Sequence, residues 1–293
     1  MLLAEKNSHP RDTRIRTEVF SDGKQNTYID GELCNGWGIT RVLDRWFPID
    51  MEAIDEHYEQ NPGKREIDEI SNRRDRLIGV MNSECAERFL DGLPFKPNPE
   101  FPEFKCFEDV PGFKNFLLAM QTLPKEWKPY RSEWPLFWKK RKRTGKPDIV
   151  LVDTTDTLCL RLIIIDLKYQ KRPTATFCSR NKPNAKRRTA CKSKNLHKAA
   201  SHALDCPARA KGALSHLLNS KDNKCGAQMA LYRAMILEKY QKQTDKPIII
   251  DNIISIFIRP GDEYIHTFDR DGISLFDPAV HEVLIASEVN DVQ

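Results

Sequence analysis

The spacing of apolar residues divides the chain into a helical first part and a second part that contains strands. Residues 39–47, 66–90 and 113–123 carry apolar side chains at helical spacing. A short strand and turn are expected at residues 27–31. Residues 1–124 are therefore predicted to form a mainly helical N-terminal region that packs on the rest of the chain.

After residue 124 the spacing of apolar residues changes from the helical period to the period of β-strands. Residues 130–138, 148–152 and 160–169 are predicted to be three strands, and the last is apolar on both faces at its centre, as in a strand covered by helices. Strands enclosed by helices indicate an α/β or α+β fold, with residues 125–293 as its core. The later predicted elements are a helix at 227–240, strands at 248–258 and 264–268, and a closing helix at 278–287.

A basic insertion interrupts this core. Residues 171–209 have no clean period and are rich in Lys, Arg, Asn, Ser and Pro, with a helical piece expected near residues 196–204. Across residues 139–224 there are 22 Lys and Arg against 6 Asp and Glu, although the whole chain carries a net charge of only +5. This asymmetry favours a surface that meets a polyanion, and the alternative is a solvated charged loop.

The composition bounds the class of protein. The 293 residues are 40% hydrophobic, which is enough for a substantial core. No apolar run approaches the ~18–20 residues that span a bilayer, and the first residues lack the apolar region of a signal peptide. We expect a soluble, intracellular protein with no membrane partner. A nuclear or cytoplasmic location is favoured over a mitochondrial one, because acidic residues accompany the N-terminal arginines.

Eight cysteines are spread along the chain without a CxxC pair. In a chain of this size that pattern favours reduced, mostly buried thiols over a disulfide framework. A zinc site is an alternative, although its spacing fits no standard module; its ligands would be Cys178, Cys191, His197, His202 and Cys206.

The candidate chemistry centres on two aspartates and a lysine. Asp148 opens one predicted strand, while Asp166 and Lys168 lie two residues apart in the next strand and so share a face. If the strands pair as a hairpin, the three side chains converge. The two carboxylates, with the carbonyl of Leu167, would hold Mg²⁺ or Mn²⁺, and Lys168 would stabilise charge developing on a phosphate. The alternative is a chance pattern on a solvent-facing strand.

Two further features extend the pattern. Glu133 lies in the strand before Asp148, and Gln228 and Tyr232 lie at i and i+4 on one face of a later helix. In this order the residues resemble the RecB-like branch of the PD-(D/E)XK nucleases, and the chain is most similar to those of large DNA viruses and some eukaryotes. The similarity covers roughly residues 28–240.

The resemblance implies a restriction-endonuclease-like core, a central mixed β-sheet flanked by helices. It also implies a role for each matching residue: Asp148 and Asp166 as metal ligands, Lys168 as the catalytic lysine, Glu133 as a supporting acid at the metal, and Gln228 and Tyr232 as positioning groups for nucleic acid.

The chain departs from this family in its long N-terminal helix. Many relatives have a metal-binding histidine four residues after a glycine, whereas Gly79 is followed at that position by Ser83. Serine is a poor ligand, so the second metal position is expected to be weak, altered or supplied by Glu84 or Glu87. The number of metal ions is therefore left open.

These features favour a Mg²⁺- or Mn²⁺-dependent deoxyribonuclease. An exonuclease acting on single strands or ends is the first choice, and an endonuclease is close behind. A nucleic-acid-binding module that does not cut and an RNA nuclease are further alternatives, and the oligomeric state is open. The basic residues expected to contact phosphates are Lys139, Lys140, Arg141, Lys142, Arg143, Lys186, Arg187 and Arg188.

Overall fold

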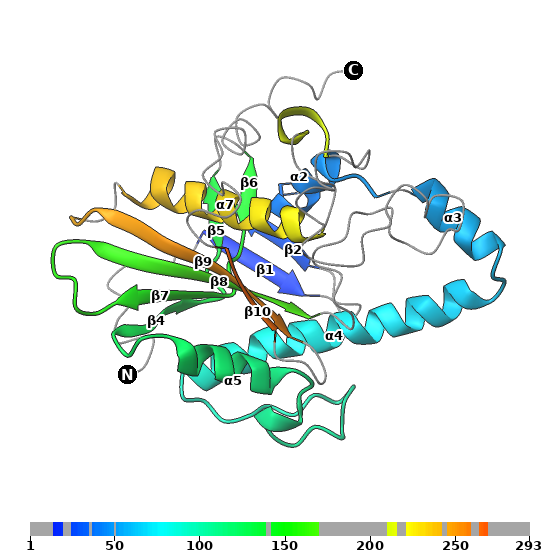
Figure 1. Ribbon diagram of the computed structural model, residues 1–293, viewed down its shortest axis with the longest axis horizontal. Helices are drawn as coiled ribbons and strands as arrows, with labels where there is room; N and C mark the ends of the chain where they lie inside the picture. Colours follow the sequence, from blue (N-terminus) through cyan, green and yellow to red (C-terminus); the bar gives the residue numbers. More distant parts are fainter. Residues whose placement is uncertain are drawn as a thin grey trace, which may run out of the picture.

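A mixed five-stranded sheet with helices on both faces forms the centre of the molecule (Figure 1). The structure is a computed structural model. It describes residues 14–19, 25–34, 37–49, 51–138, 142–169, 210–215, 221–241, 245–258 and 264–268. Over these residues the fold is α/β, as the alternation of periods predicted, and no helix within them is both long and apolar enough to cross a membrane.

The strand order in the central sheet is β10-β9-β8-β7-β4. Only β8 and β9 pair in parallel, and the other neighbours are antiparallel. Helix α7 (Lys221–Tyr240) comes between these two strands in the chain, as a parallel connection requires. The strands are β4 (Trp127–Ser132), β7 (Ile149–Asp153), β8 (Leu160–Tyr169), β9 (Ile248–Ile258) and β10 (Tyr264–Phe268).

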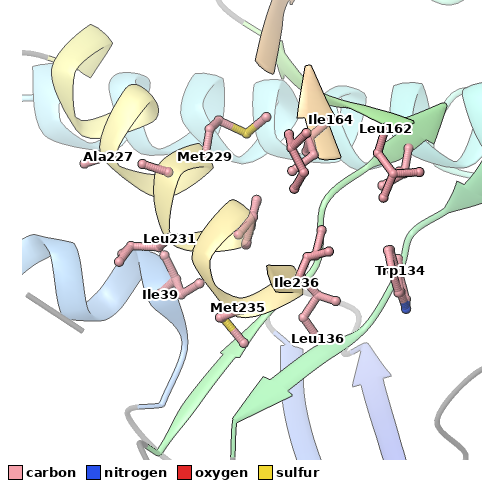
Figure 2. Packing of buried hydrophobic residues seen from close by; sticks show 14 of the residues in the cluster. Ile39, Trp134, Leu136, Leu162, Ile164, Ala227, Met229, Leu231, Met235 and Ile236 are labelled. Atoms are coloured by element: carbon pink, nitrogen blue, oxygen red, sulfur yellow. The ribbon is translucent and has the colours of Figure 1, made fainter. Parts of the chain in front are cut away.

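One face of the sheet packs against α7 and α2 (Ile39–Trp46). Leu162 and Ile164 of β8 belong to the same buried cluster as Leu231 and Ile236 of α7. Figure 2 shows residues of this cluster from both helices and from the strands lying around a shared core. The cluster fixes α7 over the strand that carries Asp166 and Lys168.

The other face packs against α4 (Lys64–Leu90) and α5 (Phe113–Thr122), which lie below the sheet in Figure 1. Ile163 and Ile165 join this second cluster, together with apolar residues of both helices. Because successive side chains of a strand alternate between faces, β8 contributes to both cores. The prediction of a central strand covered on both sides is confirmed.

Two smaller sheets and a short helix complete the described chain. A two-residue turn joins β2 to β3, and Asp30 and Gly31 both have positive φ (53° and 84°), as a tight hairpin turn of this length requires. The remaining elements are β1 (Ile15–Val19), β2 (Gln25–Ile29), β3 (Glu32–Leu33), α3 (Met51–Glu59), β5 (Leu136–Trp138), β6 (Arg143–Gly145) and the 3₁₀ turns Phe107–Asp109 and Gly212–Leu214.

Most predicted elements agree with the structure to within a few residues, but α7 begins at Lys221 instead of residue 227, α3 was not predicted, and one predicted strand is wrong. Residues 130–138 were predicted as one strand, but β4 and β5 are separate strands of different sheets. Glu133 adopts a positive φ of 45° between them, which turns the chain out of the first sheet. The N-terminal region also holds three short strands, β1 to β3. The insertion at 171–209 and the closing helix at 278–287 lie outside the described residues.

Candidate active site

Strand register brings three carboxylates to one level of the sheet. Ile149 of β7 pairs with Ile165 of β8 and with Ser132 of β4. Because these pairs are antiparallel, the neighbours at the same end are Asp148 before Ile149, Asp166 after Ile165 and Glu133 after Ser132. The Glu133 N–H donates to the carbonyl of Asp148 at 2.7 Å. The three acids that were expected to act together therefore follow one another across adjacent strands.

Asp166 and Lys168 share the face of β8 that α7 covers. Asp166 is 2% exposed, and its Oδ2 lies 2.5 Å from Nζ of Lys168. Burial by itself would lower the pKa of Lys168, but the surrounding negative groups, Asp166 foremost, raise it above the usual lysine value. Lys168 is therefore an ammonium ion at neutral pH.

Helix α7 supplies the polar partners above this pair. Lys168 Nζ donates to Oε1 of Gln228 at 3.3 Å, and Nε2 of Gln228 donates to the Tyr232 hydroxyl at 2.7 Å. Burial, and then the charge of Asp166, raise the pKa of Tyr232, so its hydroxyl keeps its proton. The structure thus links the predicted Gln–Tyr pair to the predicted lysine by hydrogen bonds.

Gly145 makes room for Tyr232. A Cβ atom built on Gly145 would lie 2.4 Å from Cε1 of Tyr232, a distance that side chains do not tolerate. Gly145 belongs to β6, and its bare backbone lets the tyrosine ring lie directly against that strand. Gly145, which lies just before the segment that carries Asp148, therefore has a packing role at the site that the sequence alone did not indicate.

Asp148 is the acid whose protonation the site disturbs most clearly. Its Oδ2 accepts the Leu167 N–H at 2.6 Å. Burial, followed by the negative charges of Asp166 and Glu133, raises its pKa well above the ordinary 3.8, although Lys168 opposes the shift. Asp148 therefore retains its proton to a higher pH than an ordinary aspartate.

Two residues at the site were not singled out as active in the sequence. Cys225 is buried, and its Sγ donates to Oδ2 of Asp166 at 3.7 Å. It lies three residues before Gln228, so helical spacing could have identified it. Lys146 forms an ion pair with Oε2 of Glu133. The only sequence signal for the contact between Lys146 and Glu133 was the position of Lys146 in the segment before Asp148.

The acids of α4 lie in different surroundings. Ser83, at the position of the family's histidine, donates to the carbonyl of Gly79 at 3.5 Å. Glu84 pairs with Lys96 at the surface, with 3.1 Å between the charged atoms. Glu87 accepts a hydrogen bond of 3.2 Å from Ser132, the residue before Glu133. Of the two glutamates considered as substitutes, Glu87 is the one tied to a strand of the site.

The basic stretch predicted to contact phosphates is described only in part. Lys142 is exposed, but Arg143 is 5% exposed and donates to the carbonyl of Lys142 at 2.7 Å. Arg143 therefore does not belong to an exposed basic surface, because its place in β6 turns it inward. The other predicted contacts lie outside the described residues: Lys139, Lys140, Arg141, Lys186, Arg187 and Arg188.

The donor atoms fit a hard divalent cation in kind. Among the described residues, no three His, Cys, Asp or Glu side chains come together as a ready metal-binding group. The candidate donors are the carboxylates of Asp148 and Asp166 and the main-chain carbonyl of Leu167, all of them oxygens such as Mg²⁺ and Mn²⁺ prefer. The raised pKa of Asp148 comes from burial first and then from the nearby Asp166 and Glu133, and a bound cation would favour its ionised form.

The cysteines in the described part of the chain are free thiols. Cys34, Cys85 and Cys225 are buried, Cys106 is exposed and Cys159 is intermediate. Reduced and mostly buried thiols were expected, and these five agree with that. The cysteines and histidines of the alternative zinc site all lie outside the described residues.

Comparison with known proteins adds no family to this description. A scan against protein-family models gave no match, and a search of curated proteins gave none either. The residues of the site and their geometry are therefore the only basis for assigning an activity.

Proposed function

We propose that the chain is a Mg²⁺- or Mn²⁺-dependent deoxyribonuclease of the PD-(D/E)XK class, with a restriction-endonuclease-like core. The observation that carries the proposal is the meeting of Glu133, Asp148 and Asp166 at one level of the central sheet, with Lys168 two residues further along β8 and its ammonium group beside Asp166. Hydrolysis of a phosphodiester needs oxygen ligands for a divalent cation and a fixed positive charge near the phosphate. These residues provide both.

Each residue has a role that its contacts support. Asp148, Asp166 and the carbonyl of Leu167 would hold the cation, which when bound polarises the phosphate and lowers the pKa of water. Asp148 would release its proton as it becomes a ligand. Lys168, held by Asp166 and Gln228, would place its ammonium group beside the developing charge.

The expected substrate is DNA with single strands or ends, on which an exonuclease would act. Gln228 and Tyr232 of α7 are buried, so they would act on the strand indirectly, by orienting Lys168, whereas exposed Lys142 would meet phosphates. An endonuclease of the same fold is the alternative within this class, and cleavage of RNA would use the same chemistry.

A binding module that does not cut is the second candidate function. It is favoured by Ser83, which occupies the family's histidine position and directs its hydroxyl to the carbonyl of Gly79. Against it, Lys168 lies 2.5 Å from buried Asp166, and the charges of both residues act on Asp148. Burying a carboxylate is costly unless the charge is paired or used. We therefore place the nuclease first.

The test is incubation with 5′- and 3′-labelled single- and double-stranded DNA and RNA, with Mg²⁺, Mn²⁺ or a chelator. We expect cleavage of DNA that requires the metal and that is lost in Asp166→Ala. Asp68→Ala, which removes an acid from a surface ion pair on α4, is the matched control and should cleave normally. Full cleavage by a folded Asp166→Ala protein would overturn the assignment of the site.

A further inference from the structure

A second ammonium group lies at the site and has no role in the reaction as set out above. Nζ of Lys146 forms an ion pair with Oε2 of Glu133. The Lys146 side chain is 31% exposed and that of Glu133 is 17% exposed. The lysine thus faces solvent on one side while it neutralises an acid of the site on the other.

The backbone holds this ion pair in place. The N–H groups of Glu133 and Trp134 donate to the carbonyls of Asp148 and Pro147, at 2.7 and 3.1 Å. The segment that carries Lys146 is therefore tied to the segment that carries Glu133. Glu133 also has a positive φ of 45°, which a residue with a Cβ rarely adopts, so its direction is set by the fold.

The arrangement of charges favours an exchange of ion-pair partners when a phosphate binds at the site. Lys168 is engaged by buried Asp166 and by Gln228, whereas Lys146 pairs with an acid closer to the surface. Partly exposed ion pairs are weak, and a phosphate is a strong acceptor for an ammonium group. A phosphodiester approaching the carboxylates would therefore find in Lys146 a cation that can leave its acid.

We propose that Lys146 contacts a phosphate of the bound strand and exchanges the Glu133 carboxylate for it when the nucleic acid binds. When the strand binds, the exchange would leave Glu133 without its ammonium partner. The Glu133 carboxylate would therefore be available as a supporting acid only in the complex. This inference rests on the proposed function, since it assumes that the site receives a phosphodiester strand.

The test replaces each member of the ion pair in turn, and the two substitutions are expected to change the affinity for nucleic acid in opposite directions. Binding of a labelled single-stranded oligonucleotide is titrated at several salt concentrations, in chelator and in Ca²⁺. Lys146→Met should weaken binding about three- to tenfold and lower the slope of log affinity against log salt by about 0.7, the value for one phosphate on a single strand. Glu133→Gln should tighten binding about two- to fivefold, because the lysine no longer has a competing acid.

The double variant and two controls complete the experiment. Lys146→Met with Glu133→Gln should bind as Lys146→Met does, and Lys146→Arg should keep the slope of the wild type. Lys64→Met, which breaks a surface ion pair with Asp68, should leave both affinity and slope unchanged. Thermal unfolding of each variant establishes that it is folded.

The outcomes separate this inference from the proposed function. Wild-type binding with an unchanged slope in Lys146→Met, or weaker binding in Glu133→Gln, would overturn the exchange and leave the nuclease proposal standing. If the wild type bound no oligonucleotide in either condition, both proposals would fail.

Discussion

At the scale of single residues, the main feature is a carboxylate held almost wholly out of water. The Asp166 side chain is 3% exposed, with the Lys168 ammonium at 2.5 Å and the Cys225 thiol at 3.7 Å. Removing a charge from water costs several kcal/mol unless paired groups compensate. Such an arrangement is expected where a protein uses the charge, and less often where it serves stability alone.

Lys168→Met tests both sides of that argument. We expect cleavage to fall by about 10²-fold or more, because a fixed charge near the phosphate is lost. The free energy of unfolding should fall by about 1–3 kcal/mol, because Asp166 is left buried without its ammonium partner. Chemical denaturation measures the stability, and gel assays measure the cleavage.

A second substitution separates charge from packing. Adding Asp166→Asn to Lys168→Met should recover much of the lost stability while activity stays absent, since no unpaired charge remains. Lys64→Met, at an exposed pair, should change stability by less than about 1 kcal/mol. If the double variant were as unstable as the single one, the loss would come from packing.

The raised pKa of Asp148 predicts a pH dependence of stability. A raised folded-state pKa means that the folded protein keeps a proton that the unfolded chain releases near the ordinary value of 3.8. The stability from this proton is fully present below that value and is lost as pH rises through the folded-state pKa. Without metal, Asp148→Asn should therefore gain stability relative to the wild type as pH rises from about 4 through the folded-state pKa of Asp148.

Denaturant unfolding across that range, in chelator, is the measurement. A divalent cation should reverse the trend in the wild type, because the ion binds the carboxylate and so binds more tightly as pH rises. A constant difference between the two proteins at all pH values would contradict the assigned shift.

Residue-level prediction from the sequence succeeded where it used local spacing. Asp166 and Lys168 are two apart in a strand, so their common face followed from the pleat. Asp148 needed only the assumption of a hairpin. The contacts of Lys146 with Glu133 and of Cys225 with Asp166 join segments that are apart in the sequence, so spacing along a single element does not specify these pairs.

At the scale of elements, the packing of α7 against β6 depends on the absence of a side chain at Gly145. Gly145→Ala would place a Cβ 2.4 Å from the ring of Tyr232. We expect a loss of about 1–3 kcal/mol from this overpacking, and a drop in activity as Tyr232 shifts away from Gln228. Thermal unfolding and cleavage assays on the same preparations test both.

Gly38 offers a matched control for this substitution. No atom lies within 4 Å of a Cβ built there, so Gly38→Ala should be nearly neutral. In a Tyr232→Ala background, Gly145→Ala should cost less, because the clashing ring is gone and only the flexible end of Ile39, 3.0 Å from the added Cβ, has to move. An equal cost in both backgrounds would show that the alanine acts on the backbone of β6 instead.

The break between β4 and β5 shows where element prediction reaches its limit. The apolar residues around Glu133 fit one continuous strand from 130 to 138. The chain instead leaves the sheet at Glu133, whose positive φ is held by its bond to the Asp148 carbonyl. A non-glycine residue is placed in that region by tertiary contacts, and its identity gives no local signal.

At the scale of the whole molecule, the two apolar clusters share the same strands. Leu162 and Ile164 face one helical layer, and Ile163 and Ile165 face the other. The double-sided hydrophobicity of β8 made this central position predictable. Which helix covers which face was not predictable, because the amphipathic patterns of α4 and α7 are interchangeable in the sequence. We expect the sheet and both layers to unfold together.

A cation bound at the rim of the sheet should therefore stabilise the whole described core. At about 100 times its dissociation constant, a ligand of the folded state adds ~2.7 kcal/mol, which corresponds to a rise in Tm of about 5 °C. Mg²⁺ or Mn²⁺ should produce this rise in the wild type and not in Asp148→Asn with Asp166→Asn. Asp68→Asn, a change at the surface of α4, should keep it. A full rise in the double variant would mean that the ion binds elsewhere, and the two aspartates would lose their assignment as ligands even if cleavage were observed.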